Sequence, residues 1–176
     1  MNCFRKYIFL FMLFLLFFIG KPAQTFSQDV DYKSYTLFLY NFMKYIEWPD
    51  KSGDFVIGVV GESKVKTELL LLAEKKKVGG RNIVVKTIVN TEDALLCNMI
   101  YVPSAKTSML KPIMEKIKDK PILVVGEREG LAKKGAGISF VVDDDDILKF
   151  DINKSVLDSQ SLKIANILMQ LGIMVG

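Results

Sequence analysis

Five short apolar runs constrain the fold of this sequence more than any other feature. They cover residues 54–60, 83–89, 99–102, 121–125 and 138–142, and glycine, proline or polar residues follow each. A nearly continuous apolar run of this length is typical of a strand that is covered on both faces, as in a parallel sheet. Helical or turn patterns separate the runs, so the sequence predicts strands alternating with helices.

The segments between and around these runs have helical periodicity. Apolar residues recur every three or four positions in 29–48, 64–77, 106–118 and 155–174, which predicts four helices with one buried face each. Pro49 ends the first of them, because the residue before a proline avoids the helical region. Residues 91–96 are interpreted as a short helical segment or a loop.

The segment 147–153 differs from the other strands because apolar and polar residues alternate in it. This pattern predicts a half-exposed strand at the sheet edge, antiparallel to 138–142. The predicted fold class is therefore α/β, a three-layer Rossmann-like sandwich. Its sheet is mostly parallel, with about five to six strands and an antiparallel edge strand, and residues 28–176 form one domain.

The first 27 residues have the pattern of a secretory signal peptide. Two basic residues precede an apolar run at 7–19, and small residues near Ser27 fit a cleavage site after that residue. Thirteen residues in a helix reach about 20 Å, which is short of the roughly 30 Å hydrocarbon core. An uncleaved anchor is the alternative. Cys3 precedes the apolar run, too early for a lipoprotein acceptor cysteine.

Composition excludes several classes of function. The whole chain has 24 basic and 20 acidic residues, but three basic residues leave with the leader, so the net charge of residues 28–176 is about +1. Nucleic acid binding would require a clustered basic face, and 75–77 is the only basic run. The sequence has no histidine, which removes the usual general base and most zinc sites. These features indicate a protein that is not an enzyme and uses no cofactor.

A single cysteine remains after removal of the leader. Cys97 cannot form an intramolecular disulfide, and its apolar neighbours predict that it is buried; intermolecular pairing is the alternative. Trp48, at the end of the first helix, is predicted to fill space between helix and sheet.

Ligands of an open parallel sheet bind beyond the carboxyl ends of its strands. The residues there that suit a small polar or anionic ligand are Gly61, Ser63, Ser104, Gly126 and Arg128, because glycine admits close approach and helix starts offer free amides. Turn glycines and helix caps explain the same residues without any ligand. No nucleotide-binding fingerprint is present.

Two acidic groups and one arginine invite chemical hypotheses. Residues 143–146 are four consecutive aspartates, but they lack the ligand spacing of a calcium loop and are interpreted as a solvated hairpin turn. Glu127 and Glu129 have no base partner that would make an acid–base pair. Arg81 is predicted at the opposite end of the sheet, in a structural ion pair.

Several segments together resemble the YfiR-type periplasmic proteins. They are 40–49, 55–61, 80–83, 97–102, 122–126, 137–140 and 148–153, which span nearly the whole chain after the leader. The resemblance implies a non-enzymatic periplasmic regulator, and a homodimer. It also implies partners: an inner-membrane diguanylate cyclase or sensor kinase, and an OmpA-like outer-membrane lipoprotein that sequesters the regulator. Redox sensing by an internal disulfide does not transfer, because only Cys97 remains.

The first helix is the predicted contact surface for such a partner. Tyr32 and Tyr45 are expected to face outward, and replacing either by serine is expected to weaken partner binding. The rival hypothesis is a periplasmic small-ligand receptor that uses the strand ends named above. An enzyme ranks third, because no nucleophile and base can be named.

Overall fold

The structure is a computed structural model that describes residues 31–176. The predicted leader and its cleavage position after Ser27 lie outside the described residues. Within 31–176, no helix combines the length and the hydrophobicity needed to cross a bilayer.

An eight-stranded sheet organises the described chain, in the order β10–β8–β7–β6–β5–β2–β4–β3. Its strands are β2 (Phe55–Val60), β3 (Lys77–Val78), β4 (Arg81–Ile88), β5 (Met99–Val102), β6 (Leu123–Gly126), β7 (Ile138–Val142), β8 (Leu148–Ile152) and β10 (Ile173–Met174). The five central strands, from β4 to β7, run parallel, whereas β3 and β8 run antiparallel to β4 and β7. A separate antiparallel pair joins β1 (Ile46–Glu47) to β9 (Lys163–Ile164).

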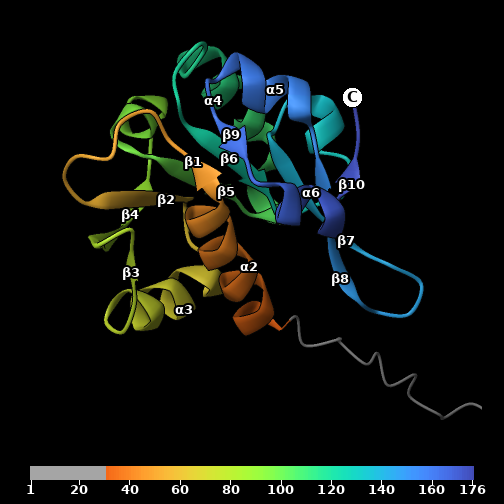
Figure 1. The fold of residues 1–176 in the computed structure, drawn as a ribbon, viewed down its shortest axis with the longest axis horizontal. Coiled ribbons are helices and arrows are strands. Elements are labelled where there is room, and N and C mark those ends of the chain that lie inside the picture. The colour runs from red at the N-terminus through yellow and green to blue at the C-terminus, as the bar shows by residue number, and fades with distance from the viewer. Residues whose placement is uncertain (1–30) are drawn as a thin grey trace, which may run out of the picture. The chain divides into compact units, whose positions relative to one another are not determined.

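Helices cover both faces of this sheet and confirm the predicted three-layer α/β class (Figure 1). One face carries α2 (Tyr32–Tyr45), α3 (Lys64–Ala73), α5 (Lys154–Ser159) and α6 (Asn166–Leu171). The other carries α4 (Leu110–Lys116) and the 3-10 helices η1 (Thr91–Leu96) and η2 (Ser104–Met109), while η3 (Ala132–Lys134) precedes β7. The sheet therefore separates two buried clusters.

Helix α2 is shorter than the predicted helix at 29–48. Its first turn is capped by Asp31, whose carboxylate accepts a hydrogen bond from the Lys33 N–H at 3.1 Å. The buried ring of Phe42 packs against Phe150, with 5.0 Å between ring centroids, which ties α2 to the sheet. The helix ends at Tyr45 because the next two residues pair with β9 as strand β1.

The predicted closing helix at 155–174 is wrong. The segment contains α5, β9, α6 and β10, and Ser161 interrupts it with a backbone φ of 56°. Strand β9 pairs with β1, and β10 pairs with the outer edge of β8. Strands β1 and β8 each have backbone N–H and C=O groups available for pairing. Hydrogen bonds to these groups replace the helical hydrogen bonds that residues of β9 and β10 would otherwise form.

The position of β8 also corrects the sequence analysis. The strand is antiparallel to β7, as predicted, but it is not the sheet edge, because β10 covers it. Phe150, Asp151 and Ile152 are buried, so the strand is less exposed than its alternating pattern indicated. The edges are β3 and β10, and the sheet has more strands than the five to six expected.

Two other helices end earlier than predicted. Helix α3 stops at Ala73 because Lys77 and Val78 pair with β4 across a turn in which Gly79 and Gly80 have φ values of 56° and 83°. Positive φ at both turn residues is the geometry of a tight hairpin, which glycine adopts without strain. The helix predicted at 106–118 divides into η2 and α4, and Pro112 lies in the first turn of α4.

Candidate functional site

The residues predicted to bind a small ligand lie at the carboxyl edge of the sheet. In chain order the five parallel strands are arranged second, first, third, fourth, fifth, and the helices that follow neighbouring strands β2 and β5 cover opposite faces. This is the topological switch point at which open α/β sheets bind ligands. Gly61 and Ser63 follow β2, Ser104 follows β5, and Gly126 ends β6 with Arg128 just beyond it.

Other parts of the chain contact these groups. The Ser63 hydroxyl accepts a hydrogen bond from the Val65 N–H as the cap of α3, and the Ser104 N–H donates to the Glu127 carboxylate at 2.5 Å. The Lys106 side chain lies over Gly61: a Cβ at Gly61 would be 2.9 Å from Lys106 Cε. The Leu131 side chain packs against Gly126, and Arg128 is exposed. Ligand binding by this edge stays a prediction.

A cluster of phenols and one carboxylate lies near this edge and was missed by the sequence analysis. Burial raises the pKa of Tyr101, and the charge of Glu127 raises it further; both causes also raise the pKa of Tyr35. The Tyr101 hydroxyl is fully buried and has no hydrogen bond of normal geometry within residues 31–176. Its only sequence signal was a tyrosine in an otherwise aliphatic strand.

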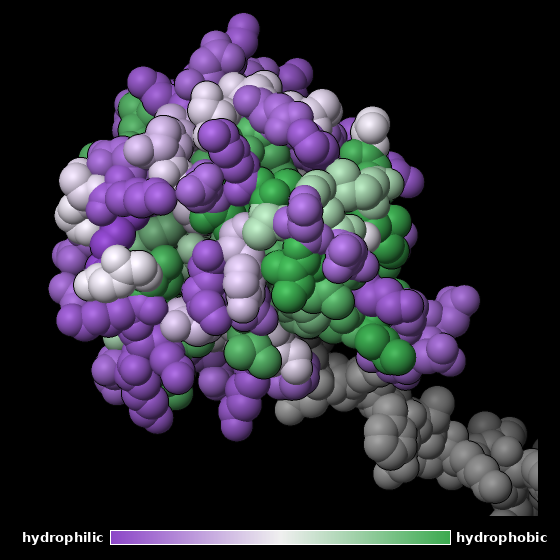
Figure 2. All heavy atoms as spheres, in the orientation of Figure 1, coloured by the Kyte–Doolittle hydropathy of each residue, from purple (hydrophilic) through white to green (hydrophobic). Residues whose placement is uncertain are grey.

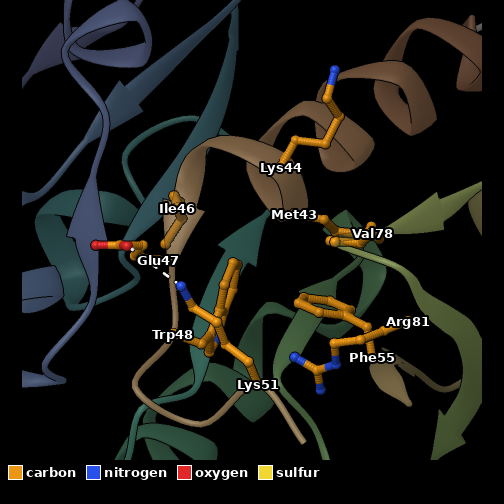
Figure 3. Close-up of a pocket in the computed structure, with 10 residues that line it drawn as sticks. Met43, Lys44, Ile46, Glu47, Trp48, Lys51, Phe55, Val78 and Arg81 are labelled. Carbon is orange, nitrogen blue, oxygen red and sulfur yellow. Dashed lines mark hydrogen bonds and ion pairs between the residues drawn. The ribbon is translucent and has the colours of Figure 1, made fainter. Parts of the chain in front are cut away.

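A groove lies at the opposite, amino edge of the sheet (Figure 3). It has a volume of about 310 Å³, and residues of two stretches of the chain, 43–55 and 78–81, line it. Its lining residues are Met43, Lys44, Ile46, Glu47, Trp48, Lys51, Phe55, Val78, Gly79 and Arg81. The sequence analysis assigned Arg81 to this end but did not predict a groove, because helix α2, hairpin β3–β4 and the loop after β1 meet only in the folded chain.

Trp48 forms one wall of the groove, and its predicted role between helix and sheet is confirmed. Its ring is 5% exposed and meets the Phe55 ring edge-on, with centroids 4.9 Å apart and planes at 90°. Its Nε1–H donates a hydrogen bond to the Asn98 carbonyl oxygen at 3.0 Å. Packing and this hydrogen bond together fix the orientation of the indole.

Arg81 is held by backbone carbonyl oxygens, where the sequence analysis expected an ion pair. Its Nε donates to the Gly53 oxygen at 2.9 Å and its Nη2 to the Asp54 oxygen at 2.8 Å. Nη2 also lies 3.5 Å from Asn98 Oδ1, and the guanidinium lies 5.4 Å from the centre of the Phe55 ring. The guanidinium is therefore fixed in position. A backbone hydrogen bond lowers the pKa of the nearby Asp50 carboxyl, and the charge of the guanidinium contributes to this lowering.

The other charges of the groove lie at its rim. Lys51 Nζ is 3.5 Å from Glu47 Oε1, and both side chains are mostly exposed, which makes a weak ion pair. Lys44 is directed away from the other lining side chains in Figure 3, and its ammonium lies 4.9 Å from the centre of the Tyr45 ring. Lys51, Glu47 and Arg81 therefore lie around an apolar interior, and the charge of Lys44 is directed away from it.

The two tyrosines predicted to contact a partner are half-buried. The rings of Tyr32 and Tyr35 lie 6.1 Å apart, and both Tyr32 and Tyr45 pack against the larger buried cluster. The exposed apolar residue of α2 is Leu37, which is 59% exposed. A contact with a partner through Tyr32 or Tyr45 stays a prediction.

A different apolar surface lies at the end of the chain. It is made by four large side chains of α6 and β10 that are about half exposed: Ile167, Leu171, Ile173 and Met174. Figure 2 shows hydrophobic side chains gathered over these elements. No residue after Lys163 has an ionisable side chain. We name these four residues the C-terminal apolar surface.

Two further expectations are resolved by the structure. Cys97 is buried as predicted, and burial raises its pKa to about 11. The four aspartates form the β7–β8 turn, where Asp143 accepts hydrogen bonds from the N–H groups of Asp145 and Ile147 and pairs with Lys149. Within the part of the chain that the structure describes, no three acidic or cysteine side chains are placed to hold a metal ion.

Comparison with known proteins assigns the chain to a family. No curated protein matches it. One similar solved structure is the ABC domain in complex with L-Trp from Streptococcus pneumonia, with 12% identity and a TM-score of 0.49 over 69% of this chain. This chain spans only 55% of that one, and the likeness supports no conclusion about function. A family model described as YfiR/HmsC-like matches residues 32–173. The chain therefore belongs to the YfiR/HmsC-like family.

Proposed function

We propose that this chain is an exported, non-enzymatic regulatory binding protein of the periplasm. It modulates an inner-membrane signalling protein, either a diguanylate cyclase or a sensor kinase, through protein contacts. An OmpA-like outer-membrane lipoprotein and a second copy of the chain are further partners in this proposal. Membership of the YfiR/HmsC-like family supports a regulatory role in general.

The C-terminal apolar surface is the observation that carries the proposal. Large apolar side chains that gather on an exposed surface mark interaction sites more often than single exposed ones do. The segment from Ile164 onward has no charged side chain, so it lacks the basic residues that attract a protein to anionic lipid headgroups. These properties favour a protein partner over a lipid surface.

Capture of the partner from envelope fractions tests this function. The Leu171→Ser variant should capture less of an identified cyclase or kinase than the wild type, because serine removes apolar area from the contact. Leu96→Ser is the matched control: Leu96 is 63% exposed and Leu171 64%, but Leu96 lies in η1, on the other face of the sheet. Both variants should keep the wild-type melting temperature, since both side chains are exposed.

Two outcomes would contradict the regulatory proposal. One is that repeated capture yields no inner-membrane cyclase or kinase. The other is that Leu171→Ser and Leu96→Ser capture the same amount as the wild type. Deletion of the gene distinguishes the two partner classes, because only a cyclase partner should change the cellular level of cyclic-di-GMP.

The groove favours a second candidate function, a small-ligand receptor. A cavity of about 310 Å³ lined by aromatic and aliphatic side chains with a few charges has the composition of a ligand site. The carboxyl-edge residues Gly61, Ser63, Ser104, Gly126 and Arg128 remain the alternative location. A thermal-shift survey of polar metabolites tests the function at either place, because a ligand at 100 times its dissociation constant stabilises by about 2.7 kcal/mol.

A further inference from the structure

We infer that the groove at the amino edge of the sheet binds a small organic anion with a flat apolar body, such as an arylcarboxylate. The inference rests on the second candidate function, the small-ligand receptor, and is independent of the regulatory proposal. Three properties of the groove carry it: the shape of its interior, the sign of the charge at its rim, and the fixed position of Arg81.

The interior fits a flat apolar group. Met43, Ile46, Trp48, Phe55 and Val78 line it, and each of these side chains is at most 7% exposed. Trp48 is 5% exposed and Phe55 1%, and the two rings pack against each other, so they offer a ligand ring a narrow rigid edge for edge-on contact. A volume of about 310 Å³ is at the lower end of the roughly 300–1,000 Å³ of ligand pockets. The size therefore favours a one- or two-ring molecule over a nucleotide.

The rim selects a negative charge. Lys51 and Arg81 flank the apolar interior, and Lys44 adds a third positive charge nearby. Glu47 is the only acidic lining residue, and it pairs with Lys51 at 3.5 Å. A bound carboxylate would gain a favourable Coulomb interaction next to apolar surface, where the effective dielectric constant is lower than in water. A cationic ligand of the same shape would be repelled.

Arg81 is placed to accept this charge without rearrangement. Backbone oxygens of Gly53 and Asp54 hold its Nε and Nη2, whereas its Nη1 has no hydrogen bond within residues 31–176. A guanidinium fixed in this way loses little conformational entropy when it binds a carboxylate. The contact through Nη1 would leave the existing hydrogen bonds of Arg81 intact.

The experiment uses protein purified after expression of the full chain, with three probes that share a benzyl group. Phenylacetate, phenylacetamide and 2-phenylethylammonium carry a negative, a neutral and a positive head group. Trp48 is the only tryptophan of the sequence and forms a wall of the groove, so its fluorescence reports occupancy directly. We expect saturable binding with phenylacetate the tightest, at least fivefold tighter than phenylacetamide, and the cation the weakest. Acetate should leave the fluorescence unchanged.

A charge-reversal pair assigns the selectivity to the groove. Lys51→Glu should weaken phenylacetate binding at least fivefold and leave phenylacetamide within twofold, because Lys51 contributes charge and little apolar surface. Lys111→Glu makes the same change in net charge on α4, at a side chain that is 88% exposed and lies on the other face of the sheet. It should leave both affinities within twofold. Both positions are exposed, so both variants should fold.

Absence of binding, or binding without charge selectivity, overturns the inference. Absence of phenylacetate binding up to 10 millimolar, about the weakest binding a receptor could use, excludes the proposed class. Equal affinity for the three probes, or equal effects of Lys51→Glu and Lys111→Glu, shows that the rim does not select charge. If the thermal-shift survey finds another ligand while phenylacetate fails, the receptor function stands and this inference falls. If phenylacetate binds while no membrane partner is captured, only the regulatory proposal fails.

Discussion

The indole nitrogen of Trp48 donates a hydrogen bond to the backbone carbonyl oxygen of Asn98 across 3.0 Å. Asn98 precedes β5, and its side-chain oxygen accepts a second hydrogen bond from the Val56 N–H at 2.8 Å. Its backbone oxygen also accepts from the Leu123 N–H at 3.0 Å. One asparagine therefore joins the groove wall to the amino ends of three neighbouring strands.

Replacing Asn98 by leucine should destabilise the fold. The partly buried Val56 N–H would lose its partner, and the expected cost is about 1 kcal/mol. Urea unfolding followed by Trp48 fluorescence measures the change. Asn82→Leu is the control, because Asn82 is exposed and bonds only the side chain of Asp54, so its replacement should cost less than about 0.5 kcal/mol. Equal costs for the two variants would contradict the role of Asn98.

The Tyr101→Phe variant should be more stable than the wild type. Phenylalanine keeps the ring and removes a fully buried hydroxyl that has no hydrogen bond of normal geometry within residues 31–176. The expected gain in the free energy of unfolding is about 1 kcal/mol at neutral pH. Tyr40→Phe is the control, since its hydroxyl donates to the Lys77 oxygen at 3.1 Å and its loss should not stabilise. Destabilisation by Tyr101→Phe would show that the hydroxyl has a partner.

Tyr101 also predicts the direction of alkaline unfolding. Burial first, and then the charge of Glu127, raise its pKa in the folded state above the ordinary value of 10.0. The folded state therefore favours the neutral phenol, and this contribution is complete below pH 10 and is lost as the pH rises above it. Wild-type stability should fall between pH 10 and 11 more steeply than that of Tyr101→Phe. Parallel pH profiles of the two proteins would refute this.

Asp151 and Asp93 should respond to pH in opposite directions. Burial raises the pKa of Asp151, so its stabilising protonated form is lost as the pH rises above 3.8. Asp151→Asn should therefore raise the melting temperature at pH 7, with a gain that shrinks as the pH falls toward 3.8. The backbone N–H groups of Asn90 and Val89 lower the pKa of Asp93, so its carboxylate stabilises above pH 3.8.

Asp93→Asn therefore provides the comparison for Asp151→Asn. It should lower the melting temperature at pH 7, and the loss should shrink as the pH falls through 3.8 and below. Scanning calorimetry of the wild type and both variants between pH 3 and 7 measures the two differences. Differences of the same sign at pH 7 would contradict the assignment of these two carboxylates.

Cys97 should resist alkylation in the folded protein. Its thiol is buried, and burial raises its pKa to about 11, so little thiolate exists at pH 8. We expect iodoacetamide to modify Cys97 at least a hundredfold faster in 8 M urea than in buffer, as followed by intact mass. Comparable rates would mean that the thiol is accessible, and an intermolecular disulfide through Cys97 would then be feasible.

Residue patterns alone predicted the central sheet. The apolar runs at 54–60, 99–102 and 138–142 coincide with β2, β5 and β7 within one residue at either end. Strands buried on both faces have a continuous apolar composition, and this signal can be recognised without knowing which strands lie beside them in the sheet. The apolar neighbours of Cys97 correctly predicted its burial, and the place of Trp48 at the end of the first helix correctly predicted that it packs between helix and sheet.

The sequence by itself therefore determined the central α/β sheet, because the apolar composition of each central strand predicts its burial. Tertiary structure decided the C-terminal 15 residues and the groove. Residues 163–164 and 173–174 have a helical pattern, yet they form strands because β1 and β8 present unpaired backbone at the right positions. The groove needs Trp48 beside Val78 and Arg81, and only packing of helix, loop and hairpin brings together residues 43–55 and 78–81, which no local pattern relates.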